Sequence, residues 1–299
     1  MALPQLYKKI TLTRSLSSIE ELTTPRSFLT ALNTLISGNV GSLVKDLVLQ
    51  DDCSSMSSED INRLFKPKYD TLLDYPVLLR LPAAAAVERC TNLRSFTWDL
   101  VRVIKPIVYR ALGRLQHLQS LRICYWAYDA EHCHFEIPPL PKLRELTVEN
   151  YLPPVYQHDF SVVLLHATRL EVLNLHFHSG PSLQTRAVYL VKFFDQLRKA
   201  RRKLGLKSFS LCNAGHEWGG DALCEAIDVQ QLKELNLVRS GYLPRWDEHN
   251  QAKLKLTKRP PAHVDGSKVV LKEYPIRWPG RGIRTLSRKH HRLRTDVSA

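Results

Sequence analysis

The chain repeats one short pattern of apolar and polar positions. In residues 140–150, LPKLRELTVEN, the apolar residues Leu143, Leu146 and Val148 follow the spacing L-x-x-L-x-L, and polar residues lie between and after them. Triplets with this spacing, other apolar residues being allowed, begin at Tyr7, Val44, Leu93, Leu118, Leu143, Leu170, Leu206 and Leu232. Consecutive triplets start 37, 49, 25, 25, 27, 36 and 26 residues apart. One triplet is a weak signal, but four steps of 25–27 residues indicate an internal repeat.

The stacking of short strands explains this pattern physically. The second and third apolar positions are two residues apart, so both side chains point to the same face of a strand. A single unit cannot bury that face alone, whereas stacked units share one continuous core. A period of about 20–29 residues is typical of leucine-rich repeats. The sequence therefore predicts an α/β fold, a leucine-rich-repeat solenoid of irregular repeats with a parallel concave sheet and convex helices.

The stretches between the triplets have the apolar spacing of helices. Residues 105–118 place Pro106 in a first turn, where a missing N–H is tolerated. Residues 159–167 begin with Asp159 as a candidate N-cap. Further helices are expected at 25–39, 72–90, 183–203 and 220–229, with Pro76 and Pro82 starting or bending segments of the second of these.

Residues that alternate with the apolar triplets are expected on the concave face. Neighbouring strands lie about 4.8 Å apart, so these side chains should form a ladder on a rigid surface, and such surfaces commonly bind proteins. The candidate protein-binding residues are Asp99, Arg122, Glu145, Thr147, Glu149, Asn174, His176, Glu234 and Asn236. Cys124 and Cys212 occupy equivalent positions. The alternative interpretation is a solvated sheet face without a partner.

The charge of the chain is concentrated near its C-terminus. The formal net charge is +14, and residues 253–299 hold 13 Lys and Arg against 3 Asp and Glu. This stretch contains four prolines and has no helical or strand period, so it is expected to be largely disordered. We therefore divide the chain into an N-terminal capping strand and helix (1–40), a repeat solenoid (41–245) and a basic tail (246–299). The tail makes association with nucleic acid an alternative function, with Tyr274 and Trp278 available for stacking on bases.

The sequence offers little catalytic or metal chemistry. Residues 130–135, AEHCHF, place His132, Cys133 and His134 in a row, but structural zinc sites use spaced ligand pairs. No nucleophile elbow, HExxH motif, P-loop or spaced glycine fingerprint is present, so we expect no enzyme activity, cofactor or metal. Six cysteines without a CxxC pair are typical of the reduced thiols of an intracellular protein. Without a spanning segment or a signal peptide, we expect a cytoplasmic or nuclear protein away from membranes.

Several of these stretches resemble a known family. The succession LPQLYKKITLT, LVKDLVLQDD, CTNLRSFTWDL and LQHLQSLRI resembles the body of fungal F-box proteins with leucine-rich repeats, over roughly residues 4–243. The resemblance implies a substrate receptor of a cullin ubiquitin ligase, in which an F-box docks the Skp adaptor and the repeats recruit the protein to be ubiquitinated.

The F-box itself is the missing part of this resemblance. None of the 299 residues form an L-P-x-E-[IVL] opening, so we expect the adaptor role not to carry over and the chain to represent the recruiting half, from a lost module or a truncated gene model. The expected partner is then a protein on the concave face. Tyr125 and Trp126, just after one predicted strand, are candidate aromatic anchors.

Overall fold

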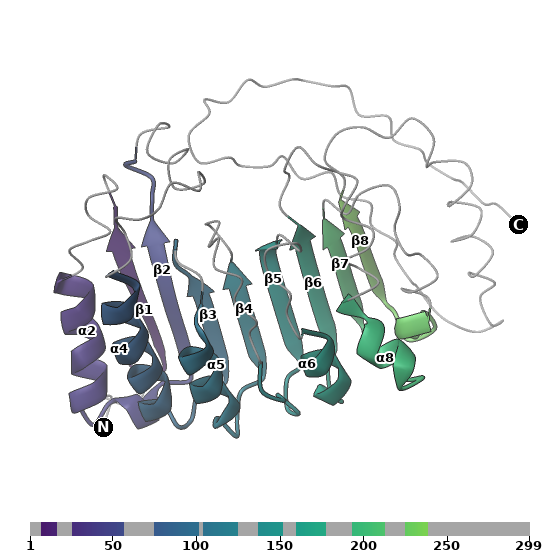
Figure 1. Cartoon of the computed structure of the whole chain (residues 1–299), viewed down its shortest axis with the longest axis horizontal. Helices are drawn as coiled ribbons and strands as arrows, with labels where there is room; N and C mark the ends of the chain where they lie inside the picture. The colour runs from purple at the N-terminus through teal and green to yellow at the C-terminus, as the bar shows by residue number, and fades with distance from the viewer. Residues whose placement is uncertain are drawn as a thin grey trace, which may run out of the picture.

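A single parallel sheet organises the molecule. The computed structural model describes residues 7–16, 26–56, 75–101, 104–124, 137–151, 160–177, 193–212 and 225–238. Within them, eight strands pair in chain order from β1 to β8, and all pairs are parallel (Figure 1). The strands are β1 Lys9–Ser15, β2 Asp46–Asp52, β3 Ser95–Asp99, β4 Ser120–Cys124, β5 Glu145–Tyr151, β6 Val172–Phe177, β7 Ser208–Cys212 and β8 Glu234–Val238. The predicted α/β class and parallel sheet are confirmed.

The strands share one register, which follows the apolar triplets. The second apolar position of each triplet lies opposite the second position of the next, in the order Ile10, Leu47, Phe96, Leu121, Leu146, Leu173, Phe209 and Leu235. The third positions align in the same way. A shift of one residue would turn the apolar side chains to the other face, so burial of one face fixes this register.

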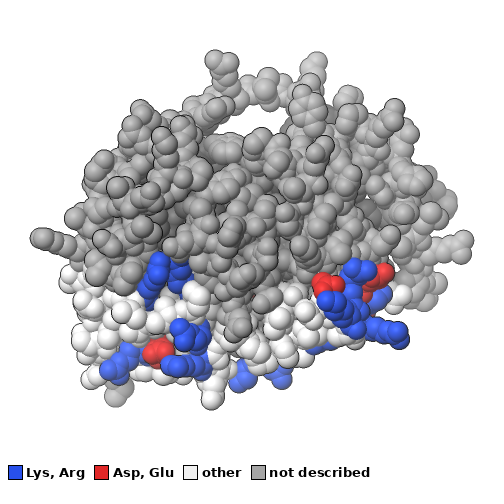
Figure 2. All heavy atoms as spheres, viewed as in Figure 1, with Lys and Arg blue, Asp and Glu red and all other residues white. Residues whose placement is uncertain are grey.

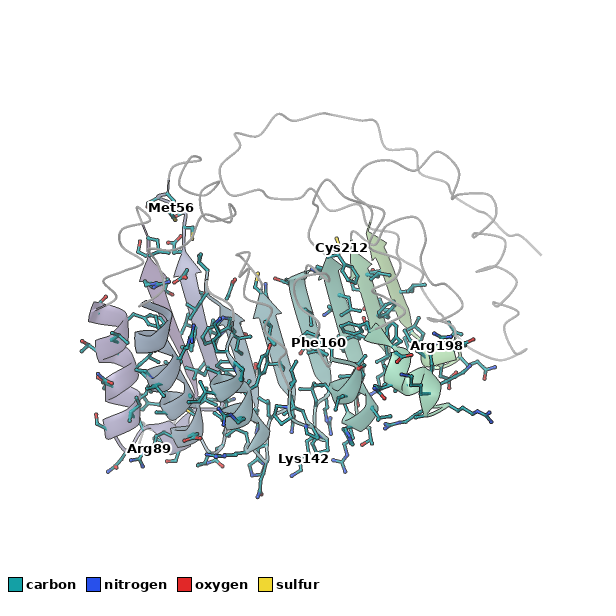
Figure 3. The ribbon with its side chains drawn as sticks, in the orientation of Figure 1. Met56, Arg89, Lys142, Phe160, Arg198 and Cys212 are labelled. Atoms are coloured by element: carbon teal, nitrogen blue, oxygen red, sulfur yellow. The ribbon has the colours of Figure 1, made fainter. Side chains whose placement is uncertain are left out.

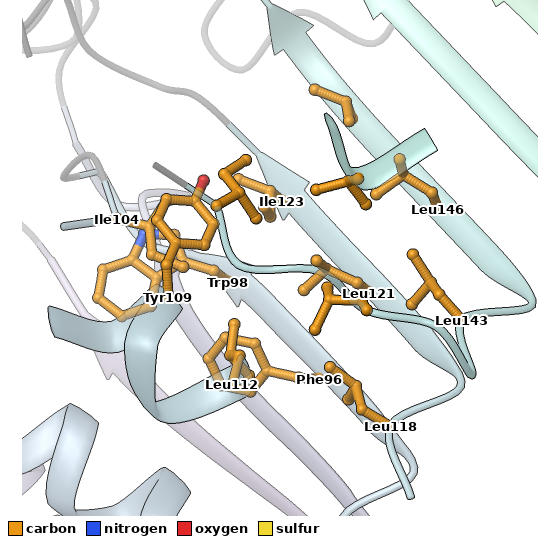
Figure 4. Close-up of a cluster of buried hydrophobic side chains, with 14 of the residues drawn as sticks. Phe96, Trp98, Ile104, Tyr109, Leu112, Leu118, Leu121, Ile123, Leu143 and Leu146 are labelled. Atoms are coloured by element: carbon orange, nitrogen blue, oxygen red, sulfur yellow. The ribbon is translucent and has the colours of Figure 1, made fainter. Parts of the chain in front are cut away.

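The apolar positions form the core between the sheet and the helices. Phe96, Leu121 and Leu146 are completely buried, and the first position of each central triplet is buried beside them. Figure 4 shows the central part of this cluster, where Tyr109 and Leu112 project from a helix toward Trp98, Phe96 and their neighbours on the strands.

The described helices cover one face of the sheet (Figure 1). They are α2 Arg26–Ser37, α4 Tyr75–Arg89, α5 Pro106–Gly113, α6 Phe160–His166 and α8 Asp195–Lys199, with a short 3-10 helix η2 at Gly41–Leu43. Helix α2 packs beside α4, α4 beside α5, and α6 beside α8. The helices expected at 25–39 and 72–90 are therefore confirmed, and Pro106 is in the first turn of α5 as predicted, but α5 ends at Gly113 instead of continuing to 118.

Two helix predictions need correction. Pro82 does not start a segment, because it lies inside the continuous helix α4, where Ala83, Ala86 and Val87 are buried in the core. The helix predicted for 220–229 does not extend to its expected end, since Ile227 instead forms a parallel bridge with Leu204. Asp159, the proposed cap of α6, and residues 183–192 lie outside the described residues, and the described end of the helix predicted over 183–203 contains α8.

A backbone ladder fixes the edge at which the strands begin. The carbonyl oxygen of Lys45 accepts hydrogen bonds from the amides of Arg94 and Ser95, at 2.7 and 3.0 Å. The carbonyl oxygen of Arg94 accepts in turn from Gln119 and Ser120. The same pairing recurs from Lys8 to Lys233, so the residue before each strand is stacked on its equivalent in the next. We call this border the amino-terminal edge; Arg89 and Lys142 lie along it in Figure 3.

The first strand belongs to the same sheet as the others. Strand β1 continues the common register, and at its end Arg14 replaces the apolar residue that would face the helices. Arg14 forms a two-pronged ion pair with Asp51 of β2, at 2.7 and 2.6 Å. The Asp51 carboxylate also accepts the backbone amide of Val101 at 2.7 Å. The predicted capping strand thus joins the sheet through a buried charge pair, whereas the predicted basic tail lies outside the described residues.

Candidate protein-binding face

The face of the sheet opposite the described helices carries the predicted binding residues. We call it the outer face. Its first row is Lys9, Asp46, Ser95, Ser120, Glu145, Val172, Ser208 and Glu234, and its second row is Thr11, Val48, Thr97, Arg122, Thr147, Asn174, Ser210 and Asn236. Asp99, Glu149 and His176 lie one step further along their strands. All nine predicted residues therefore occupy outer-face positions, on β3, β4, β5, β6 and β8.

Hydrogen bonds between neighbouring strands hold the first row. The hydroxyl of Ser120 donates to the Glu145 carboxylate at 3.1 Å, and the hydroxyl of Ser208 donates to the Glu234 carboxylate at the same distance. Both glutamates remain exposed. Each exposed carboxylate is therefore positioned by its neighbour and still available to a partner.

The second row differs from the expectation at Thr147. Its side chain was expected to meet solvent, but Thr147 is only 7% exposed. The amide of Asn174 on the next strand donates to the Thr147 hydroxyl at 3.0 Å, which orients both side chains. Cys124, expected to be exposed at the end of β4, is also buried. Thr147 therefore supports Asn174 and cannot itself provide much contact area.

The centre of the outer face is a cluster of three charged or titratable groups. Arg122 donates to the Glu149 carboxylate at 2.9 Å, and Nδ1 of His176 lies 3.7 Å from the other carboxylate oxygen. Burial lowers the pKa of His176 below its ordinary value; Glu149 opposes this shift and Arg122 reinforces it. His176 is therefore neutral near pH 7 and Arg122 is the cation that satisfies Glu149.

Asn236 ends the second row with an incomplete set of hydrogen bonds. Its amide nitrogen donates to Glu234 at 3.1 Å. Its carbonyl oxygen is buried and has no hydrogen-bond partner among the described residues. A buried acceptor without a partner is costly, so this oxygen is a candidate acceptor for a donor group supplied by a ligand.

Most of the charged side chains among the predicted binding residues are negative. Four of the nine are carboxylates, namely Asp99, Glu145, Glu149 and Glu234, and Arg122 is the only cation while His176 is neutral. Asp99 is half-buried beside Gln50 of β2. The arrangement is suited to a partner with cationic side chains and hydrogen-bond donors.

Reactive and metal-binding groups are scarce in the described part of the chain. Its four cysteines are free thiols, and burial raises the pKa of Cys53 to about 12 and that of Cys90 to about 11, so both are protonated at neutral pH. No group of three His, Cys, Asp or Glu residues there could hold a metal ion. The His132–Cys133–His134 run, Tyr125, Trp126 and the basic tail lie outside the described residues.

Sequence reasoning overlooked the amino-terminal edge. The residue after the first apolar position of each triplet is Lys8, Lys45, Arg94, Gln119, Arg144, Glu171, Lys207 or Lys233, so six of eight are cations. This bias was visible in the sequence but was masked by the nearly balanced total charge of the body. Figure 2 shows Lys and Arg gathered along the border where the strands begin.

Comparison of the chain with protein-family models, with curated proteins and with solved structures found no match. None of the helices in the described ranges combines the length and apolar character needed to cross a membrane.

Proposed function

We propose that the chain is a leucine-rich-repeat solenoid whose outer face recognises a protein partner without catalysis, as the substrate-recruiting repeats of an F-box ubiquitin-ligase receptor do. The observation that carries the proposal is the common register of eight parallel strands, which aligns mostly polar side chains in two rows, interrupted only by Val172 and Val48. The triplet spacing and the family resemblance support it from the sequence.

Pre-organisation supports recognition by this surface. Ser120, Asn174 and Ser208 hold outer-face side chains by hydrogen bonds across strands. Side chains fixed in this way lose little conformational freedom on binding, a cost of about 0.5–1.5 kcal/mol for each long side chain that must otherwise be immobilised. The sheet therefore presents its carboxylates at little entropic cost.

The partner that fits best carries Lys or Arg along an extended segment. Glu145 and Glu234 provide exposed carboxylates at the two sides of β6, and Glu149 adds a third, half-buried one. Arg122 should repel a cationic partner only weakly, because Glu149 already neutralises part of its charge. Complementary charge of this kind sets orientation and encounter rate, and the contacts that become dry supply the affinity.

Affinity capture with a charge-reversed outer face tests this function. Glu145→Lys/Glu234→Lys changes two exposed carboxylates of the outer face, and Glu88→Lys/Glu225→Lys makes the same change on two exposed carboxylates of the helices. Quantitative mass spectrometry should identify a protein captured by the wild type and by the helix variant, and at least tenfold depleted with the outer-face variant. Equal recovery from all three baits would contradict the proposal.

The ligase aspect requires its own measurement. Co-purification of the full chain with a recombinant Skp adaptor would support assembly into a cullin ubiquitin ligase. Failure to co-purify, with partner capture retained, would leave protein recognition as the function and remove ligase assembly from it.

Association with nucleic acid is the second candidate, favoured by the excess of 13 cations over 3 carboxylates in residues 253–299. Binding through such a segment releases counterions, so its affinity falls by about 10³–10⁵ between 50 and 200 mM salt when 6–10 phosphates are contacted. Fluorescence anisotropy of a labelled duplex over this salt range tests for such binding. Protein capture by the pre-organised outer face, which carries few charges, should depend far less on the salt concentration.

A further inference from the structure

A hollow of about 430 Å³ opens at the amino-terminal edge between β5 and β8. Five cations and one carboxylate line it: Arg144, Arg169, Arg202, Lys203, Lys207 and Glu171. Their formal charges leave four positive charges around a space within the range of small-ligand pockets, about 300–1,000 Å³. This hollow lies away from the outer face and does not belong to the function proposed above.

The backbone ladder explains how these residues come together. The carbonyl oxygen of Arg144 accepts the amides of Glu171 and Val172, and the carbonyl oxygen of Glu171 accepts those of Lys207 and Ser208. Arg144, Glu171 and Lys207 are therefore stacked on three consecutive strands. Arg169 comes from the turn after α6, and Arg202 and Lys203 follow α8.

The positive charge of the hollow is only partly compensated. Lys207 forms an ion pair with Glu171 at 2.9 Å, and this hydrogen bond holds the pKa of Glu171 below its usual value, with Arg144 acting in the same direction. The side chains of Arg144, Arg169 and Lys203 make no hydrogen bond or ion pair within the described part of the chain. Within the described ranges, these three cations thus keep their donors free.

The turn after α8 adds an independent observation. Arg201 adopts a φ of 50°, the left-handed conformation that usually belongs to glycine. The amides of Arg201 and Arg202 donate to the carbonyls of Arg198 and Leu197, which closes the helix in a Schellman motif. Beyond this turn, the guanidinium of Arg202 donates to the carbonyl oxygen of Leu165 at the end of α6. The turn therefore folds Arg202 and Lys203 back over the hollow, although an arginine occupies its strained position.

We propose that this hollow binds the clustered phosphate groups of a compact polyanion. Arginine guanidinium groups match phosphate oxygens with two parallel hydrogen bonds, and lysines add point charges around them. Several phosphates on one small ligand would occupy the free donors of Arg144, Arg169 and Lys203 together and relieve their mutual repulsion. A single monovalent anion would compensate less of the charge, so affinity should rise with the number of phosphates.

Calorimetric titration with sodium tripolyphosphate, at 150 mM salt and with the full chain, tests the proposal. Arg144→Gln/Arg169→Gln/Lys203→Gln removes the three free cations of the hollow. Lys8→Gln/Arg89→Gln/Arg94→Gln is the matched control, since it removes one lysine and two arginines from exposed positions elsewhere on the same edge. We expect binding at least tenfold weaker with the hollow variant and within twofold of the wild type with the control.

The outcomes separate a built site from charge alone. Equal losses in both triple variants, or no binding by the wild type, would overturn the proposal. Thermal unfolding of both variants verifies that they are folded, and Arg169→Gln/Lys203→Gln provides a second, milder change at exposed positions.

Co-sedimentation with phosphatidic acid vesicles distinguishes the source of the phosphates. Loss of sedimentation with the hollow variant alone assigns lipid headgroups, whereas no sedimentation of the wild type with retained tripolyphosphate binding assigns a soluble ligand.

Discussion

Arg14 and Asp51 show how one ion pair can decide the stability of a sheet end. Their side chains are 5% and 1% exposed, and Asp51 also accepts the amide of Val101. Removing one partner of a buried pair takes the counter-charge away from the other, at a cost of about 3–5 kcal/mol. We predict that Asp51→Ala lowers the free energy of unfolding by this amount in urea titrations.

The double variant Arg14→Met/Asp51→Leu is the matched control for this pair. It removes both charges, and replacing a buried pair with apolar residues of similar size is often neutral. It should therefore lose less stability than Asp51→Ala. A single variant as stable as the wild type would show that the pair contributes little.

His176 provides a pH-dependent test of the outer face. Burial holds its pKa below the ordinary value of 6.5, Glu149 raises it and Arg122 lowers it. In nuclear magnetic resonance titrations we expect the His176 pKa below 6.5, lower still in Glu149→Gln and higher in Arg122→Gln. A higher His176 pKa in Glu149→Gln, or a lower one in Arg122→Gln, would contradict the arrangement.

The same shift links His176 to stability. Because its pKa is lower in the folded than in the unfolded state, unfolding takes up a proton in the interval between the two values. The stability contributed by the neutral imidazole is complete above pH 6.5 and is lost as the pH falls toward the folded pKa. His176→Gln should flatten this part of the stability curve in urea titrations at several pH values.

Single residues also show where sequence reasoning reached its limit. Alternation along a strand placed Thr147 and Cys124 on the correct face, but both are buried. Their exposure depends on what the neighbouring strands contribute, and the donor on Asn174 comes from 27 residues further along the chain. Spacing within one strand carries no information about such a contact.

At the scale of elements, the turn after α8 gives a prediction about backbone strain. A left-handed conformation costs an L-residue about 1–2 kcal/mol, and glycine avoids this cost. Arg201→Gly should therefore raise the free energy of unfolding by about 1 kcal/mol, measured by urea titration. Ala200→Gly, one position earlier with a φ of −80°, should lower it by about 0.5–1 kcal/mol instead. A destabilised Arg201→Gly would mean that the arginine side chain contributes more than the strain removes.

Helix α4 shows why element boundaries were harder to predict than strands. Proline inside a helix removes a hydrogen bond, which made Pro82 appear to be a boundary. Ala83, Ala86 and Val87 are nevertheless buried against the core, and helical stability in proteins comes mostly from such packing. The triplets, by contrast, encode burial directly, so all eight strands were predicted from their spacing.

At the scale of the whole molecule, some opposite charges that are adjacent in sequence lie on different surfaces. Carboxylates of Glu145 and Glu234 lie on the outer face, whereas Arg144 and Lys233, their immediate neighbours in sequence, lie at the amino-terminal edge. The separation arises because the chain turns into the strand between the two positions. The sequence showed only a balanced body, since adjacent opposite charges cancel in any count.

Stacking of strands in chain order predicts a gradient of stability along the sheet. Among the described strands, each pairs only with its sequence neighbours, so the central strands are supported on both sides while β1 and β8 are supported on one. Hydrogen exchange measured by mass spectrometry should find the slowest amides in β4 and β5 and faster exchange in β1 and β8. Equal protection of β1 and β5 would contradict stacking as the source of stability.

Two truncations at equivalent positions extend this test to stability. Leu146 is completely buried in β5, and its truncation to alanine should cost about 2–5 kcal/mol and speed exchange first in β4, β5 and β6. Ile10 occupies the same register position in β1 but is only half-buried, so Ile10→Ala should cost less and affect β1 and β2 alone. If Ile10→Ala instead accelerated exchange through β8 as strongly as Leu146→Ala, the sheet would unfold as one unit and nearest-neighbour stacking would not describe it.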